Sequence, residues 1–405
     1  MTRKRILFYV QHLLGIGHLK RASVIANAMT QRGLDVTIVA GGEPAPIAFD
    51  GARVVQLPPI HARDAESYRL ADSNDKRIGP LFWRRRRKML LQTFEEVAPH
   101  AVVVEMFPFG RFEFARELIP LLEAAKKKNC ARISSMRDIV QPKRRASDNE
   151  RMVEMSEKYF DRVLIHSDPS LIRIERSLPQ ARRIERQIHY TGYVVSNGAP
   201  ASAGPSIPAS AGPSIPASAG PSIPASAGPL IPAEAGAPFV IVSIGGGAVG
   251  ERLLRAAIEA RPFTRYHAEP WRLICGMNLP ANRVDALKRD VPEGVEVDTH
   301  RDDFIALSQR ARVSISQAGY NTAMELLASR VTCVFVPFAA KGETEQTERC
   351  RVLQERGLAR FIAETELTPR LLAQAIDDAQ PPRDVAIDFN GAMRSVDLIE
   401  DAIGG

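Results

Sequence analysis

The stretch SQAGYNTAMELLASRVTCVFVPFAAKGETEQTERC, residues 316–350, decides how the C-terminal half of the chain is interpreted. A short β-branched run at residues 313–315 predicts the end of a strand, and Gly319 breaks it. Asn321 or Thr322 is then a suitable N-cap for the helix that follows. A strand, a glycine turn and a helix N-terminus together predict an anion site, because backbone N–H groups and the positive end of the helix dipole point outward.

Polar residues behind this turn predict contacts to a neutral, hydroxyl-rich ligand. Glu325 lies near the first turn of the predicted helix, and a second strand at residues 331–336 leads to a further helix that opens with Glu345 and Gln346. A carboxylate repels a phosphate, so Glu325 is expected to face vicinal sugar hydroxyls. Gln346 both donates and accepts, which suits another hydroxyl-bearing partner. In the alternative interpretation, Glu325 only caps its helix and Gln346 lies on the surface.

This pattern resembles a known enzyme family. Gly-Tyr-Asn-Thr at residues 319–322, Glu325 three residues later, a Val-Pro strand end and a Glu-Gln pair that begins 20 residues after Glu325 are similar to the donor-binding half of the family 28 glycosyltransferases. That family includes the peptidoglycan GlcNAc transferase that makes lipid II and uncharacterised relatives. Ala318 departs from the pattern, because many relatives have Gly or Ser there.

The resemblance implies a role for each matching position. The glutamate of the family motif holds the ribose of a nucleotide-sugar, the Gly-Thr turn lies near the phosphates, and the Glu-Gln pair reads the sugar. The expected donor-binding residues in this half of the motif are Gly319, Asn321, Thr322, Glu325, Glu345 and Gln346.

The N-terminal end of the chain predicts a second strand–turn–helix unit. Residues 6–10 are typical of a buried strand, residues 15–18 (Gly-Ile-Gly-His) of a turn, residues 19–31 of a helix and residues 36–40 of the next strand. This order is typical of a doubly wound sheet. A dinucleotide-binding fingerprint is not indicated, because a third glycine and a ribose-binding acid are missing.

The family resemblance extends more loosely to this first loop. In the family, a glycine-rich turn that ends in histidine lies at the cleft between two lobes, and Gly15, Gly17 and His18 match it. An inverting sugar transfer needs a general base, because the acceptor hydroxyl loses its proton as it attacks. The resemblance therefore implies that His18 is the catalytic base and that Gly15 and Gly17 lie on the acceptor side. In the alternative interpretation, His18 only caps the helix that begins at Leu19.

The rest of the chain completes two lobes, and the resemblance implies the GT-B architecture of two doubly wound α/β lobes facing each other across a cleft. Gly245, Gly246 and Gly247 follow a predicted strand and precede a helix from Glu251, which suits a diphosphate; a turn needed only for tight packing is the alternative. The last helix, residues 391–403, is expected to cross back onto the first lobe. The other predicted strands are residues 102–104, 131–134, 163–166, 190–194, 239–244, 271–275 and 295–297.

Between the lobes the sequence repeats itself. The octapeptide PASAGPSI begins at Pro200 and recurs, with one variant and one decayed copy, up to the copy that begins at Pro232. A period rich in Pro, Ala, Gly and Ser cannot bury a core, so we expect a disordered linker with extended character. The predicted domains are an acceptor-side lobe at residues 1–198, the linker at 199–238 and a nucleotide-sugar-binding lobe at 239–405.

Charge is divided unevenly between the predicted lobes. Residues 1–198 hold 34 Lys and Arg against 22 Asp and Glu, a net charge of +12, whereas residues 239–405 hold 20 against 24, a net charge of −4. A basic lobe suggests an acidic partner: anionic lipid, a phosphorylated acceptor or nucleic acid. Arg137, at a predicted strand end, is a candidate to hold an acceptor phosphate, or else a structural partner of Asp138.

A basic cluster in the first lobe has aromatic and apolar neighbours. Residues 84–88, Arg-Arg-Arg-Arg-Lys, follow Trp83 and precede a Met-Leu-Leu run. Such a cluster could touch an anionic membrane surface, and a solvated helix face is the alternative. No stretch approaches 18 apolar residues, and the short apolar run at residues 6–10 does not fit a signal peptide.

The cysteines and the hydropathy together indicate a compartment. Four scattered cysteines without a C-x-x-C pair argue for a reducing environment and against both zinc sites and a disulfide framework. The expected location is the cytoplasm, with peripheral attachment at the inner face of the membrane as an option.

The leading hypothesis is a metal-independent, inverting transfer of a sugar from a nucleoside diphosphate donor to an acceptor hydroxyl. We find no D-x-D element that would hold a metal with the diphosphate, so helix dipoles and glycine amides are expected to stabilise the leaving group, and no cofactor or metal ligand is predicted. One alternative is a nucleotide-sugar epimerase of the same fold, which would need acid and base carboxylates around the hexose ring. The other is a noncatalytic nucleotide-sugar or nucleic-acid binder.

Overall fold

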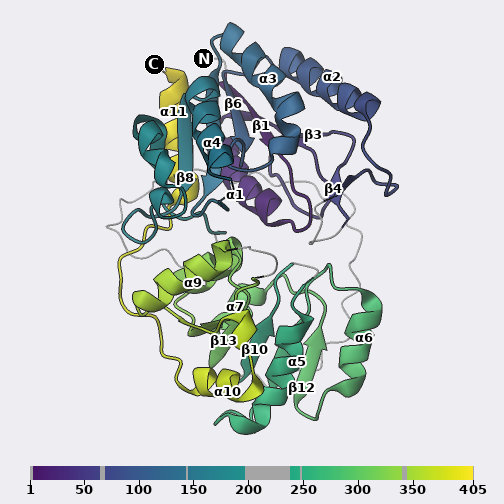
Figure 1. Cartoon of the computed structure of the whole chain (residues 1–405), viewed down its shortest axis with the longest axis vertical. Helices are drawn as coiled ribbons and strands as arrows, with labels where there is room; N and C mark the ends of the chain where they lie inside the picture. The colour runs from purple at the N-terminus through teal and green to yellow at the C-terminus, as the bar shows by residue number, and fades with distance from the viewer. Residues whose placement is uncertain are drawn as a thin grey trace, which may run out of the picture.

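The computed structural model describes residues 3–63, 69–142, 145–196, 238–246, 249–339 and 344–404. Two α/β lobes lie one above the other along the long axis of the molecule, and both chain ends lie in the N-terminal lobe (Figure 1). The octapeptide repeats and Gly247 lie outside the described residues, so the predicted extent of the linker stays a prediction.

The N-terminal lobe is built on a parallel seven-stranded sheet with the order β3-β2-β1-β6-β7-β8-β9. A separate antiparallel pair, β4 and β5, lies beside it. The strands of this lobe are β1 (Arg5–Val10), β2 (Asp35–Ala40), β3 (Arg53–Gln56), β4 (His61–Ala62), β5 (Leu70–Ala71), β6 (Ala101–Glu105), β7 (Ala131–Arg137), β8 (Arg162–His166) and β9 (Ile188–Tyr190).

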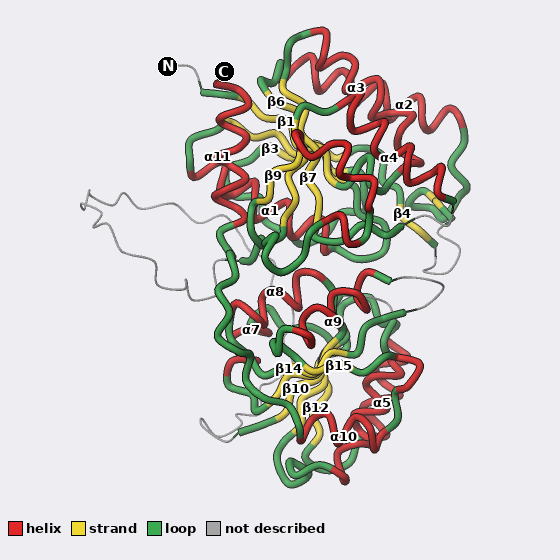
Figure 2. Tube along the Cα trace, turned by 60° about the vertical axis from the view of Figure 1, so that its left-hand side comes forward, coloured by secondary structure: helices red, strands yellow, loops and turns green. Residues whose placement is uncertain are grey.

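Helices cover both faces of this sheet, as Figure 2 shows. Ile6 and Phe8 of β1 pack into one buried cluster and Leu7 and Tyr9 into another, because successive side chains of a strand point to opposite faces. Buried side chains of this kind on both faces are typical of a parallel sheet. The helices of the lobe are α1 (Gly17–Gln31), α2 (Pro80–Val97), α3 (Ala115–Lys127) and α4 (Ala146–Tyr159), with 3-10 turns at Phe112–Phe114, Ile174–Arg176 and Pro179–Gln187.

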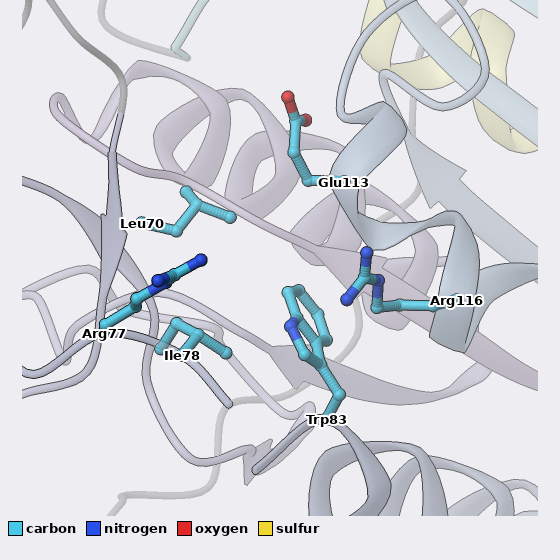
Figure 3. A pocket seen from close by; sticks show the side chains of 6 residues that line it. All are labelled: Leu70, Arg77, Ile78, Trp83, Glu113 and Arg116. Atoms are coloured by element: carbon cyan, nitrogen blue, oxygen red, sulfur yellow. The ribbon is translucent and has the colours of Figure 1, made fainter. Parts of the chain in front are cut away.

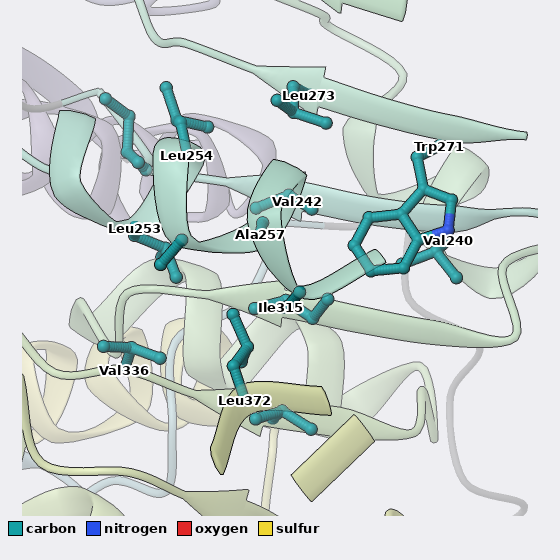
Figure 4. Packing of buried hydrophobic residues seen from close by; sticks show 14 of the residues in the cluster. Val240, Val242, Leu253, Leu254, Ala257, Trp271, Leu273, Ile315, Val336 and Leu372 are labelled. Carbon is teal, nitrogen blue, oxygen red and sulfur yellow. The ribbon is translucent and has the colours of Figure 1, made fainter. Parts of the chain in front are cut away.

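The C-terminal lobe repeats this plan on a parallel six-stranded sheet with the order β12-β11-β10-β13-β14-β15. Fully buried Trp271 lies in its largest hydrophobic cluster, where helices pack on one face of the sheet (Figure 4). The strands are β10 (Val240–Ser243), β11 (Trp271–Ile274), β12 (Val295–Asp298), β13 (Val313–Ser316), β14 (Cys333–Phe335) and β15 (Arg360–Phe361), and the helices are α5 (Glu251–Ala260), α6 (Ala281–Asp290), α7 (Phe304–Gln309), α8 (Tyr320–Ala328), α9 (Glu345–Glu355) and α10 (Pro369–Asp377), with 3-10 turns at Arg261–Phe263 and Glu364–Glu366.

The last helix, α11 (Gly391–Gly404), belongs to the N-terminal lobe in space. Val396 and Ile399 are buried in the same cluster as Ile6 and Phe8 of β1. The chain therefore returns from the second lobe and closes the first one.

Two parallel, doubly wound sheets in one chain confirm the predicted GT-B fold class, and two local predictions are wrong. The strand predicted at residues 190–194 ends at Tyr190, because Gly192 has a left-handed φ of +82° and the Tyr193 N–H donates to the carbonyl of Asp388. The predicted N-cap, Asn321 or Thr322, lies inside α8, which begins one residue earlier at Tyr320 with Gly319 as the N-cap.

Candidate functional site

The strand order of each sheet indicates where a ligand binds. In the N-terminal lobe the order reverses between β1 and β6, and in the C-terminal lobe it reverses between β10 and β13. Ligands of open α/β sheets bind beyond the carboxyl ends of the strands at such switch points. All the residues predicted for the base and for the phosphate turns follow β1, β10 or β13.

Contacts between the lobes join these two switch points. The side-chain amide of Asn321, in the first turn of α8, donates to the carbonyl oxygen of Gly17 at 3.0 Å. Asn278 donates to the carbonyl oxygens of Leu14, at 3.4 Å, and of Gly246. The predicted acceptor-side loop and the predicted donor turn therefore lie against each other.

His18 lies at this junction and is paired with a carboxylate. Its Nδ1 is 2.9 Å from Oε1 of Glu105, the last residue of β6, and its side chain is 15% exposed. Burial lowers the pKa of His18 to about 3, and the hydrogen bond to Glu105 opposes this shift only in part. The ring bonds to Glu105 rather than to the backbone of α1, so the alternative in which it only caps that helix is not what the structure shows.

Arg21 completes a buried cluster around this pair. Its guanidinium forms an ion pair with Glu105, and Nη2 lies 3.3 Å from Nδ1 of His18. Burial alone would raise the pKa of Glu105, but the Arg21 charge and the hydrogen bond with His18 outweigh it and lower the pKa to about 2. A carboxylate of this kind accepts the Nδ1 proton of His18 and leaves Nε2 as the basic nitrogen.

Sequence reasoning missed Glu105 and Arg21 as site residues. Glu105 ends a strand adjacent to β1, and Arg21 lies one helical turn after His18, so both positions carried a signal. The signal that could have identified them is Glu105, a charged residue at the carboxyl end of β6, the strand beside β1 at the switch point.

The donor turn of the C-terminal lobe offers backbone groups. Gly245 has a left-handed φ of +66°, and a side chain at Gly276 would lie 2.0 Å from the carbonyl oxygen of Gly245. Thr322 lies within 4 Å of where a Cβ of Gly245 would be, whereas the space in front of Gly319 is open. Glycine lets the backbone approach a ligand closely here. The first N–H groups of a helix such as α8 have no partner within the helix, so they are available to a ligand.

Glu325 is buried and already has partners from the other lobe. The residue is 5% exposed. Its carboxylate accepts hydrogen bonds from Nζ of Lys20, at 2.9–3.0 Å, and from Oγ of Ser196, at 2.7 Å. It does not cap α8, because the N-cap is Gly319. Its predicted role in holding a ribose stays a prediction.

The predicted sugar-reading pair is divided between two tasks. Gln346 accepts from the backbone N–H groups of Ala318, at 3.0 Å, and Phe338, at 3.1 Å, so it joins the ends of β13 and β14. Glu345 is buried and pairs with Arg349 of its own helix at 2.6 Å and with Arg137 of the other lobe. The structure thus places Glu345 in an interlobe ion-pair cluster.

Arg137 and Asp138 both belong to that cluster but do not pair with each other. Fully buried Arg349 forms two hydrogen bonds with Asp138, at 2.6 and 2.7 Å, while Arg137 pairs with Glu345. The alternative of a structural role therefore agrees with the ion pairs of both residues, although the two do not pair with each other. Arg137 is 19% exposed and its Nε is buried without a partner among the described residues, so its predicted contact to an acceptor phosphate stays a prediction.

The basic cluster at residues 84–88 is only partly a surface feature. Arg86 is fully buried and binds both carboxylate oxygens of Glu117, at 2.8 and 2.9 Å, and Trp83 is 8% exposed. The expected patch of five cations beside an accessible Trp83 is corrected, because these two residues belong to the core of the lobe. The exposed members of the cluster are Arg84, Arg85, Arg87 and Lys88, and Leu81 is exposed on the same helix.

One edge of Trp83 lines a surface pocket. Its ring centre lies 5.1 Å from the guanidinium carbon of Arg116, and Figure 3 shows Leu70, Arg77, Ile78 and Glu113 around the same hollow.

Within the described ranges, no helix combines the length and apolar character that a bilayer span requires.

The fold and this site define a two-lobed GT-B protein. Residues 241–396 match the model of the Glycosyltransferase family 28 C-terminal domain. The C-terminal lobe is therefore similar to the family 28 glycosyltransferase domain, and the resemblance predicted from residues 319–346 is confirmed.

Individual relatives agree with this assignment. The chain is 28% identical over 161 residues to UDP-N-acetylglucosamine--N-acetylmuramyl-(pentapeptide) pyrophosphoryl-undecaprenol N-acetylglucosamine transferase of Syntrophotalea carbinolica, which covers 38% of this chain and 44% of the relative. The alignment thus spans less than half of that relative.

Solved structures extend the likeness in fold to the whole chain. The crystal structure of Acinetobacter baumannii MurG has a TM-score of 0.57 and 16% identity, covering 98% of this chain and 99% of MurG. The glycotransferase of kitacinnamycin has a TM-score of 0.63 and 17% identity, covering 99% of this chain and all of that one.

Proposed function

We propose that the protein is a glycosyltransferase that moves a sugar from a nucleoside diphosphate-sugar to an acceptor hydroxyl, with inversion at the anomeric carbon and without a metal. The observation that carries the proposal is the His18–Glu105 pair at the loop that touches the N-terminal turn of α8. It brings a candidate base to a candidate anion site across one cleft.

In the proposed reaction His18 acts as the base. The acceptor O–H proton passes to Nε2 while the acceptor oxygen forms a bond to the anomeric carbon, and the bond from that carbon to the phosphate oxygen breaks with its electrons. Glu105 holds the Nδ1 proton and stabilises the imidazolium as it forms. The lowered pKa keeps the ring neutral near pH 7, so Nε2 has a free lone pair, but it also makes the ring a weak base. Proton transfer to His18 therefore depends on Glu105 to stabilise the imidazolium.

The leaving nucleoside diphosphate gains negative charge on the other side of the cleft. The backbone at Gly245 and Gly246 and the first N–H groups of α8 are placed to stabilise that charge. Glu325 lies further along α8, where it suits hydroxyl groups rather than phosphate. The proposal also assigns donor binding to Gly319, Asn321, Thr322, Glu345 and Gln346, on the family resemblance of residues 319–346.

The donor and the acceptor are proposed from the relatives and the charge of the lobes. The named transferase relatives use UDP-N-acetylglucosamine and a pyrophosphoryl-undecaprenol acceptor, according to their names. A UDP-sugar donor and a lipid-linked, phosphorylated acceptor fit a net charge of +12 on residues 1–198. Such an acceptor would place the protein in the cytoplasm at an anionic membrane surface; no nucleic acid is part of the proposal.

An epimerase of the same fold is less well supported. It would need free carboxylates near the hexose, but Glu105, Glu325, Glu345 and Asp138 are each paired with a lysine or an arginine. A pure binding protein would not need the His18–Glu105 pair.

A screen of labelled UDP-sugars with lipid-diphosphate acceptors, in the presence and absence of EDTA, tests the proposal. We expect UDP and an acceptor glycoside of inverted anomeric configuration by NMR, with or without EDTA. Recovery of an epimerised donor would support the isomerase instead. An unchanged donor, despite binding, would support the noncatalytic alternative.

A further inference from the structure

Lys20 connects the two walls of the proposed donor site. It lies in the first turn of α1, two residues after His18, and its Nζ is 2.9 Å from Oε1 and 3.0 Å from Oε2 of Glu325 on α8. The Lys20 side chain is 39% exposed, whereas that of Glu325 is 7% exposed. A partly exposed ammonium of the N-terminal lobe therefore pairs with a nearly buried carboxylate of the C-terminal lobe.

The carboxylate assigned to the ribose thus already has two partners. Both of its partners, Lys20 and Ser196, precede the linker and belong to the N-terminal half of the chain. A carboxylate has about four lone-pair sites, and Lys20 and Ser196 already occupy some of them, so a ribose hydroxyl that donates to Glu325 competes with these two partners. Ser196 is a neutral donor, whereas Lys20 carries a charge that needs a new partner after it leaves.

A diphosphate bound at the N-terminus of α8 would lie one helical turn from Glu325 and could be the new partner of Lys20. Thr322 is three residues before Glu325 on the same face of α8, and it adjoins Gly245 of the glycine turn. One turn of helix is about 5.4 Å, and the lysine ammonium is a point charge on a flexible four-carbon stem. An ammonium at Glu325 can therefore reach a diphosphate bound at Gly245 and the N-terminus of α8.

The neighbouring cation cannot make the same movement. Arg21 is 3% exposed, is paired with Glu105 and lies 5.0 Å from the centre of the Tyr320 ring. It is fixed on the base side of the cleft. Lys20 combines exposure, a flexible stem and a location beside the donor turn.

We propose that Lys20 is a donor-binding residue that exchanges the Glu325 carboxylate for the diphosphate when the nucleotide binds. This inference rests on the proposed function, because it assumes a nucleoside diphosphate in the C-terminal lobe. The exchange makes the site selective: a diphosphate compensates the displaced ammonium, whereas a nucleoside without phosphate leaves it unpaired. Lys20 thereby determines specificity for the phosphorylated form of the ligand.

The test compares UDP with uridine. Dissociation constants are measured by calorimetry for UDP and by competition for uridine, with wild type, Lys20→Met, Lys20→Arg and Ser196→Ala. Lys20→Met keeps the aliphatic stem and removes the charge, so UDP binding is expected to weaken at least tenfold while uridine binding stays equal or becomes tighter. Lys20→Arg is expected to recover most of the UDP affinity. Ser196→Ala is expected to change the dissociation constants of UDP and uridine by the same factor.

Two results would overturn the inference. Unchanged UDP affinity in Lys20→Met would show that the ammonium stays away from the diphosphate. A parallel loss for UDP and uridine, not recovered by Lys20→Arg, would show that Lys20 only supports Glu325. Failure of the wild type to bind UDP or any other nucleoside diphosphate would instead contradict the proposed function, and the two failures are therefore distinguishable.

Discussion

The two lobes share one local architecture and use it differently. In each lobe a switch-point strand runs into a glycine turn and a helix. After Gly17 the N-terminal lobe presents three ionisable side chains, His18, Lys20 and Arg21. In the C-terminal lobe the described part of the turn, Gly245 and Gly246, presents backbone only. In the proposed mechanism the same βα unit supplies a base in one lobe and an anion site in the other.

This difference shows why fold likeness alone does not describe the site. Backbone N–H groups stabilise a bound anion in any strand–glycine–helix unit, so that part of the site follows from the architecture. Proton transfer needs a particular side chain with a particular partner, such as His18 with Glu105. The net charge also differs between the lobes. It is +12 in residues 1–198, where the turn carries ionisable side chains, and −4 in residues 239–405, where the turn offers backbone groups.

The largest effect is expected from removing the base. His18→Ala is expected to lower kcat by about 10²–10⁴-fold, the usual contribution of general base catalysis. UDP affinity is expected to change little, because His18 is paired with Glu105 and is not among the residues proposed to bind the donor. Glu105→Gln is the companion variant, with a smaller loss, since the imidazolium loses its carboxylate partner. Steady-state kinetics and calorimetry separate the two quantities.

The pH profile provides an independent check of the same pair. A base acts only when it is deprotonated, and the pKa of His18 is lowered to about 3. The kcat/KM of the wild type is therefore expected to show no loss from His18 protonation between pH 8 and 5, with loss only as the pH falls toward 3. An acid limb centred near pH 6.5 and absent from His18→Ala would contradict the structural environment described for His18.

A second prediction concerns stability in the basic lobe. Arg86→Met leaves the Glu117 carboxylate buried and without its cation, which is expected to lower the free energy of unfolding by about 3–5 kcal/mol. Arg85→Met on the same helix is exposed and is expected to change stability by less than about 0.5 kcal/mol. Denaturant titrations of both variants measure the difference, and equal stabilities would show that Arg86 behaves as a surface cation.

A third prediction concerns the donor wall. Glu325→Ala is expected to weaken UDP binding by about 1–3 kcal/mol, because buried ribose hydroxyls lose a charged acceptor. The loss should appear with uridine as well as with UDP, unlike the loss expected for Lys20→Met. Calorimetry on both ligands makes this comparison, and unchanged affinity for UDP would remove Glu325 from the donor site.

The sequence was sufficient to predict the two lobes, most of the strands and the glycine turns that follow β10 and β13. These features depend on local patterns: β-branched runs, glycine turns and the spacing from Gly319 to Gln346. The N-cap of α8 was mispredicted because Asn321 has the preferred side chain for a cap but instead donates to Gly17 of the other lobe. A tertiary contact replaced the local preference.

Pairings between distant residues could not be predicted in the same way. Arg349 pairs with Asp138 across 211 positions and Lys20 with Glu325 across 305. No local pattern distinguishes these charged residues from exposed ones. Arg86 illustrates the point: it lies in a run of five cations, yet α2 turns this one toward Glu117 and the others toward solvent.

The smallest effect per residue is expected at the remaining surface cations of α2, and it tests whether the charge of the basic lobe meets a membrane. Arg84, Arg85, Arg87 and Lys88 are exposed beside Leu81, which is 74% exposed. Each cation near an anionic surface contributes about 1 kcal/mol, and salt screens this attraction. We therefore expect co-sedimentation with anionic but not zwitterionic vesicles at low salt, and release at high salt.

The matched variant changes Arg84, Arg85 and Arg87 to Ala and keeps Arg86, so that the core ion pair with Glu117 is preserved. Vesicle binding is expected to be lost while the melting temperature and UDP affinity stay close to those of the wild type. The reason is that the exposed cations contact solvent, whereas the donor site lies in the other lobe. Equal binding to both vesicle types, or no binding at low salt, would assign the positive charge to a soluble acidic acceptor, and the contrast between a charged lobe and a backbone-based lobe would then apply to the acceptor alone.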